Sequence, residues 1–267
     1  MDTENKDALF RLLRFNSNFS GSSNVFTSLD DYISRMKPGQ DKIYYAFGPS
    51  YDAAMNSPFY EPFIGKDVPV LIITQQLDEF CLTSSAEFKG MKFVNIEQTQ
   101  MDEIRKDLGI EANKEKDKGS RVPEEDVTNL CLWLKDVCAA KVAKVSLSKR
   151  LTNTPAILQG QMSSSMYMMM QMLQSSGQIP GGGAAQEMPK DLTLEINDSH
   201  PTIINLNTLR KADPAFAKDL CLVFLDQVLT TSNIPYDLKE SFGRNQKVME
   251  AYLDENLNFY SAKSKQH

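Results

Sequence analysis

Helical patterns and short apolar runs alternate along the early part of the chain. An amphipathic helix is predicted to begin at the N-cap Ser28 and to end before Pro38. Two further helical patterns cover Tyr51–Phe63 and Gln76–Phe88. Three strands are predicted around these helices: Ile43–Phe47, Val70–Thr74 and Lys92–Ile96. The middle strand is apolar throughout, as a strand covered on both faces should be, so we expect a small three-layer α-β-α unit.

A break in composition follows this unit. The charged run Asn113–Lys118 is typical of a solvated linker and predicts a domain boundary. We therefore expect one domain over residues 1–118 and a second over residues 119–267. A helix is predicted to start at Pro123 in the second domain. Two strands are predicted after it: Lys141–Leu151 and Leu192–Ile196. The expected architecture is an α/β domain followed by a mixed α+β domain that ends in a helix bundle.

The C-terminal helical patterns are unusually apolar. Lys218–Leu229 is apolar nearly all round, so each of its sides must be covered, and a partner subunit is the natural cover. The final helix repeats its seam positions at spacings of four and three residues, as helix bundles do. Asn245 within that seam would lower stability while fixing the register. We predict a homodimer with these interface residues: Leu220, Phe224, Leu238, Phe242, Asn245, Met249 and Tyr252.

A methionine-rich segment separates the two strands of the second domain. Gln161–Met172 holds six of the thirteen methionines, and the surrounding residues 151–186 contain no charged side chain. As a helix, this segment has an apolar arc of roughly 200°, wider than packing against one core requires. It is therefore either a helix buried in a core or subunit interface, or a protruding helix that adapts to dissimilar apolar partners. Gln and Ser interrupt the run, which disfavours a membrane span.

Charge and cysteine content narrow the function classes. The 267 residues carry a net charge of −6, which argues against a general nucleic-acid binder. The four cysteines lack C-x-x-C spacing and only two histidines are present, so we do not expect a metal site. We expect the cysteines to be reduced thiols. No apolar h-region opens the chain, so no signal peptide is expected.

Catalytic patterns are weak in this sequence. Gly48-Pro49-Ser50 after the first strand is more typical of a turn than of a phosphate site. Asp78 and Glu79 lie in the first turn of a predicted helix, where carboxylates favour the helix dipole. His200 is the only internal histidine, so no Ser/His/Asp or Cys/His set can be assembled. An alternative hypothesis, a small α/β enzyme with a C-terminal dimerisation module, would need polar groups of these two loops to converge: Gly48–Tyr51 and Thr74–Asp78.

Several motifs occur in the order found in one known family. They are Leu13-Arg14-Phe15, Thr27–Lys37, Ile43–Gly48, Ser57-Pro58-Phe59, Asp78-Glu79-Phe80, Glu87-Phe88, Arg150-Leu151, Pro155-Ala156 and Leu194–Asn197 with His200. From about Leu9 to Leu253 the chain resembles the heat-shock protein 90 chaperones. The stretches that most resemble the mitochondrial, tumour-necrosis-factor-receptor-associated type are Tyr60-Glu61, Gln76–Glu79 and Leu132–Leu134.

The resemblance implies a part of a dimeric, ATP-dependent chaperone that assists protein folding under stress. The family's nucleotide-binding domain and catalytic arginine loop lie upstream of the matched region, so the chain resembles the later middle domain plus the C-terminal dimerisation domain. We therefore expect no catalytic residue and no cofactor in this chain, with ATP and magnesium used by the full-length protein. The chain ends Ser264–His267 without the acidic co-chaperone motif of cytosolic members, which fits a mitochondrial type.

The resemblance also implies a role for the methionine-rich segment. In relatives the equivalent stretch is an amphipathic helix that projects between protomers and contacts client proteins. We therefore expect a client-facing helix over residues 161–174. Its predicted contact residues are Met162, Met166, Tyr167, Met169, Met170 and Leu173.

Overall fold

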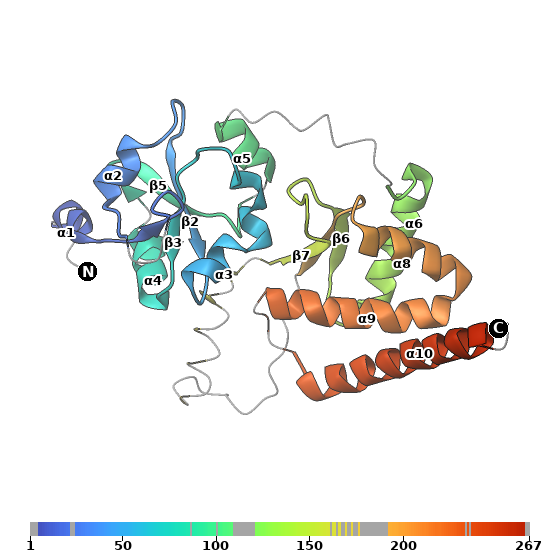
Figure 1. Ribbon diagram of the computed structural model, residues 1–267. Helices are drawn as coiled ribbons and strands as arrows, with labels where there is room; N and C mark the ends of the chain where they lie inside the picture. The colour runs from blue at the N-terminus through green and yellow to red at the C-terminus, as the bar shows by residue number, and fades with distance from the viewer. Residues whose placement is uncertain are drawn as a thin grey trace.

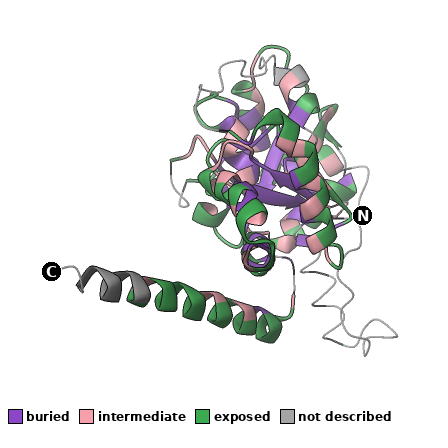
Figure 2. Ribbon diagram, turned by 90° about the vertical axis from the view of Figure 1, so that its right-hand side faces the viewer, coloured by how far each residue is buried: buried purple, intermediate pink, exposed green. Residues whose placement is uncertain are grey.

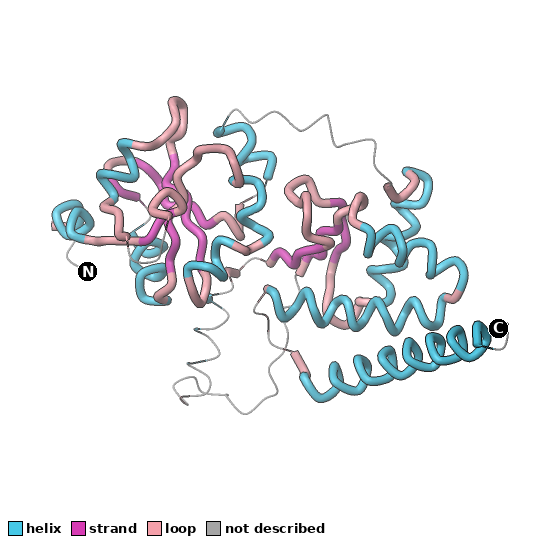
Figure 3. The backbone as a smooth tube through the Cα atoms, viewed as in Figure 1, coloured by secondary structure: helices cyan, strands magenta, loops and turns pink. Residues whose placement is uncertain are grey.

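The computed structural model places the chain in two parts, each built on its own sheet (Figures 1 and 3). It describes these residues: 5–21, 25–85, 87–99, 101–108, 121–160, 162, 163, 165, 166, 169, 172, 176, 192–232, 234 and 236–264. We call residues 5–108 the N-terminal part and residues 121–264 the C-terminal part. The predicted boundary between residues 118 and 119 lies outside the described residues and stays a prediction.

The sheet of the N-terminal part has five strands in the order β1-β3-β2-β5-β4. The strands are β1 Asn16–Ser17, β2 Lys42–Phe47, β3 Leu71–Ile73, β4 Glu87–Phe88 and β5 Met91–Asn95. The three predicted strands form its centre, because β2 pairs in parallel with both β3 and β5. Two short strands that the sequence analysis did not anticipate, β1 and β4, pair antiparallel at the edges.

Helices cover both faces of this sheet, so the predicted three-layer arrangement is confirmed. One face packs against α1 Lys6–Leu12, α2 Leu29–Ser34 and α4 Gln76–Ser85. The other packs against α3 Tyr51–Met55, the 3-10 helix η1 Pro58–Phe63 and α5 Met101–Leu108. Alternate residues of β2 serve the two cores: Tyr45 faces the α4 side and Tyr44 the η1 side.

Two of the predicted helices are shorter than expected. The pattern over residues 51–63 divides into α3 and η1, because Ser57-Pro58 starts a new turn and Pro62 cannot continue an α-helix. The pattern over residues 76–88 ends at Ser85, and the chain then forms the β4–β5 hairpin. Lys89 and Gly90 make its turn, both with positive φ.

The C-terminal part has a three-stranded sheet in the order β6-β8-β7. The strands are β6 Lys144–Leu147, β7 Ala156–Gln159 and β8 Thr193–Ile196. The helices whose bounds are described here are α6 Glu124–Val137, α8 Pro201–Ala212, α9 Pro214–Thr231 and α10 Leu238–Ser264. The mixed α+β prediction is confirmed. Most of the apolar side chains of α9, which were expected to need a partner subunit, are covered within the chain by α6, α8 and the sheet.

Side chains near the middle of the chain join the two parts. Leu151 and Ile157, which belong to the C-terminal part in sequence, pack into the N-terminal core. The buried Arg150 donates to the carbonyl oxygens of Ile96 and Thr99 at 3.3 and 3.0 Å. Among the helices of the described ranges, none combines the length and the hydropathy that crossing a bilayer requires.

Candidate binding surfaces

The methionine-rich segment lies between β7 and β8. Met162, Met166 and Met169 are among its described residues, whereas Tyr167, Met170 and Leu173 lie outside them. The backbone is helical at Ser165, Met166, Met169 and Met172. Met166 is 45% and Met172 67% exposed, and Met162 and Met169 are half-buried. Two of these methionines are therefore open to solvent in the single chain, as a protruding apolar surface requires.

The start of this segment lies against the N-terminal part. Ser163 and Ser165 are buried, with their hydroxyl oxygens 3.0 Å apart. Next to Ser163 lies Glu79 of α4, whose Oε1 accepts a hydrogen bond of 2.8 Å from the amide of Asn95. Glu79 lies in the first turn of α4 as expected, but its side chain is buried rather than solvated. Burial, followed by repulsion from Glu97, raises the pKa of Glu79 to about 7.

Helix α4 adds an apolar patch that the sequence analysis missed. Leu77 and Phe80 are 74% and 52% exposed, one helical turn apart on the outer face. Buried Leu82 and Glu79 lie on the opposite face. The sequence does contain an indication of this patch, because Leu77 and Phe80 are apolar although they lie outside the face of α4 that packs on the sheet. Because Glu79 lies beside Ser163, α4 and the start of the methionine-rich segment are neighbours.

A second exposed apolar surface runs along α10. Figure 2 shows this helix extending away from the body of the molecule with most of its residues exposed. Four of the predicted interface residues on it are 63–71% exposed: Leu238, Phe242, Met249 and Tyr252. Asn245 is also exposed, and its amide donates to the carbonyl oxygen of Ser241 at 2.9 Å. We call these five residues the α10 seam.

Helices α8 and α9 enclose an apolar groove of about 620 Å³. Its lining includes the other two predicted interface residues, Leu220 and Phe224. Leu220 is half-buried, whereas Phe224 is buried within the chain. Leu206, Leu209 and Val223 complete its apolar wall. The groove and the α10 seam are thus two apolar surfaces within the same part of the molecule.

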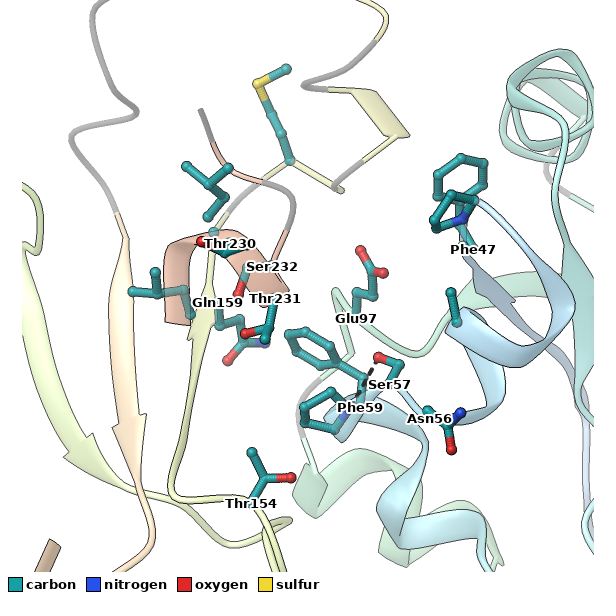
Figure 4. A pocket seen from close by; sticks show the side chains of 18 residues that line it. Phe47, Asn56, Ser57, Phe59, Glu97, Thr154, Gln159, Thr230, Thr231 and Ser232 are labelled. Carbon is teal, nitrogen blue, oxygen red and sulfur yellow. Dashed lines mark hydrogen bonds between the residues drawn. The ribbon is translucent and has the colours of Figure 1, made fainter. Parts of the chain in front are cut away.

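The two parts also enclose a cavity of about 440 Å³ (Figure 4). Phe47 and Phe59 line it from the N-terminal part, and Gln159 and Thr231 from the C-terminal part. Met162, the first residue of the predicted client contact, also lines this cavity. That methionine therefore lies at the junction of the two parts, unlike the exposed Met166.

Loops after β2 and β3 border a further cavity of about 460 Å³, as the enzyme alternative requires. Ser50, Thr74, Asp78 and Arg14 bring polar groups to it. Ser50 is engaged as the N-cap of α3, and Arg14 donates to the carbonyl oxygens of residues 11 and 13. Burial raises the pKa of Asp78. Among the residues that the structure describes, neither a histidine nor a cysteine lines this cavity, and no three metal-ligating side chains form a cluster.

Known proteins are similar in sequence to most of this chain. The family model "Hsp90 protein" matches residues 1–267. A "Chaperone protein HtpG" of Methylococcus capsulatus is 36% identical over 229 residues, covering 85% of this chain and 34% of that protein. The "TNF receptor-associated protein 1 homolog, mitochondrial" of Dictyostelium discoideum is 28% identical over 250 residues, covering 93% and 33%. The chain thus spans about a third of the length of these curated relatives, and it belongs to the Hsp90 protein family.

Proposed function

We propose that this chain is the part of an Hsp90-family chaperone that binds unfolded or partly folded client proteins and forms the homodimer. In this role residues 1–118 are the later middle domain and residues 119–267 the C-terminal dimerisation domain. The observation that carries the client-binding role is the exposure of Met166 and Met172. Soluble proteins seldom leave such apolar surface open without a partner.

The proposed client surface is made of flexible side chains. The methionines supply unbranched, polarizable side chains that can fit dissimilar apolar segments. Leu77 and Phe80 are a separate exposed apolar pair, on α4 of the N-terminal part. Tyr167, Met170 and Leu173 stay in the proposed contact set on the strength of the family resemblance alone.

Dimerisation is proposed through the C-terminal helices. The α10 seam offers apolar side chains at bundle spacing, and the groove with Leu220 and Phe224 offers an apolar counterpart. A twofold arrangement lets each copy present both surfaces to the other, which gives a closed, isologous interface. Seven residues make up this proposed interface: Leu220, Phe224, Leu238, Phe242, Asn245, Met249 and Tyr252.

ATP hydrolysis is assigned to segments of the full-length protein other than this chain. The proposed division of labour gives ATP and magnesium to the nucleotide-binding domain, and client binding and dimerisation to the residues described here. The relatives include bacterial proteins at 36% identity and a mitochondrial one at 28% identity, so a mitochondrial location stays a prediction. The small α/β enzyme is the second candidate, favoured only by the cavity beside Asp78 and weakened by the engagement of Ser50 as a helix cap.

The client-binding role is tested by changing Met166 and Met172 together to Ser. Both side chains are exposed, so we expect the free energy of unfolding to change by no more than about 0.5 kcal/mol for each substitution. Suppression of the aggregation of an unfolded client should nevertheless be lost, because the apolar surface becomes polar. Thermal melting and light scattering of the client measure the two effects side by side.

Leu12→Ser is the matched control, since Leu12 is 73% exposed on α1 in the N-terminal part. This variant should keep full suppression of client aggregation. If the two methionines were instead part of a core, their loss would cost on the order of 2 kcal/mol or more each. Marked destabilisation with normal client protection would therefore reject the proposed surface.

A further inference from the structure

Helix α10 is attached to its own chain mainly by polar side chains. Of the α10 residues whose exposure is described, only Ser241 is buried. Arg244 and Val248 are half-buried on the same side of the helix. The side chains of the α10 seam point elsewhere and are exposed. The apolar residues of α10 therefore do little to hold the helix against α9, which it contacts through Arg244.

Asp226 of α9 supplies the ionic attachment point for α10. Its side chain is only 2% exposed, yet it carries two cationic partners. Arg244 of α10 donates to Oδ2 from Nε at 3.1 Å and from Nη2 at 2.7 Å. Lys141, in the turn after α6, donates to Oδ1 at 3.1 Å. Both carboxylate oxygens are thus occupied, one by α10 and one by the body of the C-terminal part.

Further contacts stabilise the turn between α9 and α10, and Lys141 takes part in one of them. The hydroxyl groups of Thr230 and Tyr236 lie 2.7 Å apart across this corner. The ammonium group of Lys141 lies 5.6 Å from the centre of the Tyr236 ring, within the range of a cation–π contact. Arg244 also pairs with Glu240 one turn earlier on α10, at 2.5 Å. The Arg244 guanidinium is therefore held between two carboxylates, those of Glu240 and Asp226.

We infer that Asp226 is a positioning residue that sets the angle of α10 and thereby presents the α10 seam to the second copy. This role rests on the proposed dimerisation through α10. Asp226 would act from inside the chain and would not touch the partner. Without its charge, Lys141 and Arg244 would face each other as two poorly solvated cations, and repulsion would push α10 away from α9.

The test compares Asp226→Asn and Arg244→Gln with the unchanged protein by sedimentation over a range of concentrations. Each variant should raise the dimer dissociation constant by at least about tenfold. Arg244→Lys keeps the charge and should restore part of the affinity. Asp219→Asn is the control, because Asp219 lies on the exposed side of the same helix and should leave dimerisation unchanged.

A distance measurement separates positioning from simple loss of stability. Spin labels at positions 218 and 254, both exposed, report the separation of α9 and α10 when labelled chain is mixed with excess unlabelled chain. Cys81 and Cys131 are first replaced by Ser, because both are partly exposed. Arg244 lies outside the hydrophobic core, so the Arg244→Gln variant should stay folded. The distribution of distances between the two spin labels should broaden.

The outcomes are distinguishable. If the unchanged protein sediments as a monomer, the proposed dimerisation fails first. If it is a dimer and both charge-removing variants keep its affinity and its distance distribution, the positioning role of Asp226 is overturned. Weakened dimers with an unchanged distance distribution would likewise overturn it, because α10 would then not have moved.

Discussion

At the scale of single residues, Glu79 is the side chain whose state depends most on its surroundings. Its ordinary pKa of 4.5 rises to about 7 because the folded chain buries it beside Glu97. Asn95, Tyr45 and Ser163 are the polar groups that face it and partly oppose this rise. A carboxyl group with a raised pKa favours the folded state when protonated. Its contribution to stability is therefore complete below pH 4.5 and is lost as the pH rises through about 7.

Changing Glu79 to Gln should consequently stabilise the protein at pH 8 and have little effect near pH 4.5. The expected gain at pH 8 is as much as about 3 kcal/mol, from roughly 1.36 kcal/mol per pKa unit. Denaturant unfolding at a series of pH values measures this. Glu87→Gln, at an exposed position, should follow the unchanged protein at every pH. A difference between Glu79→Gln and the unchanged protein that stays constant with pH would refute the titration of Glu79.

At the scale of elements, α10 is notable for an apolar surface that its own chain leaves uncovered. Phe242→Glu combined with Met249→Glu places two charges in the α10 seam, where an apolar partner surface would have to desolvate them. We expect a monomer with unchanged helix content, measured by light scattering and circular dichroism. Lys247→Glu, exposed on the same helix but outside the seam, should remain a dimer. A dimer that survives the double substitution would place the interface on other elements.

The sequence best predicted the elements that have a strong hydrophobic periodicity or a clear capping residue. The central strands of the first sheet, α2 with its Ser28 cap, and the long C-terminal helices all have clear periodicity or capping residues. Strand β7 was missed because its four residues lie in the same uncharged stretch as the methionine-rich segment. The edge strands β1 and β4 have two residues each, too few to show any alternation.

The sequence predicted a candidate surface only where residue spacing alone shows which face of a helix is apolar. The α10 seam is exposed as its spacing suggested, whereas the inward position of Glu79 depends on Asn95 and Ser163, which are distant in sequence. Exposure of Leu77 and Phe80 depends on which face of α4 meets the sheet, and tertiary packing decides that. The buried pairing of Asp226 with Arg244 likewise joins two helices across a turn.

At the scale of the whole molecule, a polar junction couples the two parts. The side chain of Arg150 is 1% exposed, contacts Glu195 at 3.5 Å and donates to two carbonyl oxygens of the N-terminal part. Glu61 of η1 accepts hydrogen bonds from the backbone amides of Thr152 and Asn153 at 2.6 and 3.2 Å. These contacts lie around the chain just before β7 and join the two parts by several hydrogen bonds.

Arg150→Met should uncouple the two parts. It removes the buried charge and leaves Glu195 without its cation, a change that typically costs about 3–5 kcal/mol. We expect calorimetry to show a lower melting temperature and two separate transitions in place of one. The neighbouring Lys149→Met breaks only an exposed ion pair with Asp102 and should cost less than about 1 kcal/mol. A single transition at the original temperature would show that the parts are joined by other contacts.

The pairing of β7 with β8 has a consequence for how the chain can vary. Gln159 lies opposite Thr193 in an antiparallel ladder, so residues 160–192 connect two paired strands. The entropy of closing a loop changes slowly with its length, by about 0.6 kcal/mol for each halving. Changing the length of this connection should therefore alter the free energy of folding little, provided that the buried Ser163 and Ser165 are kept. We expect insertions and deletions in this connection to leave the pairing of β7 with β8 unchanged.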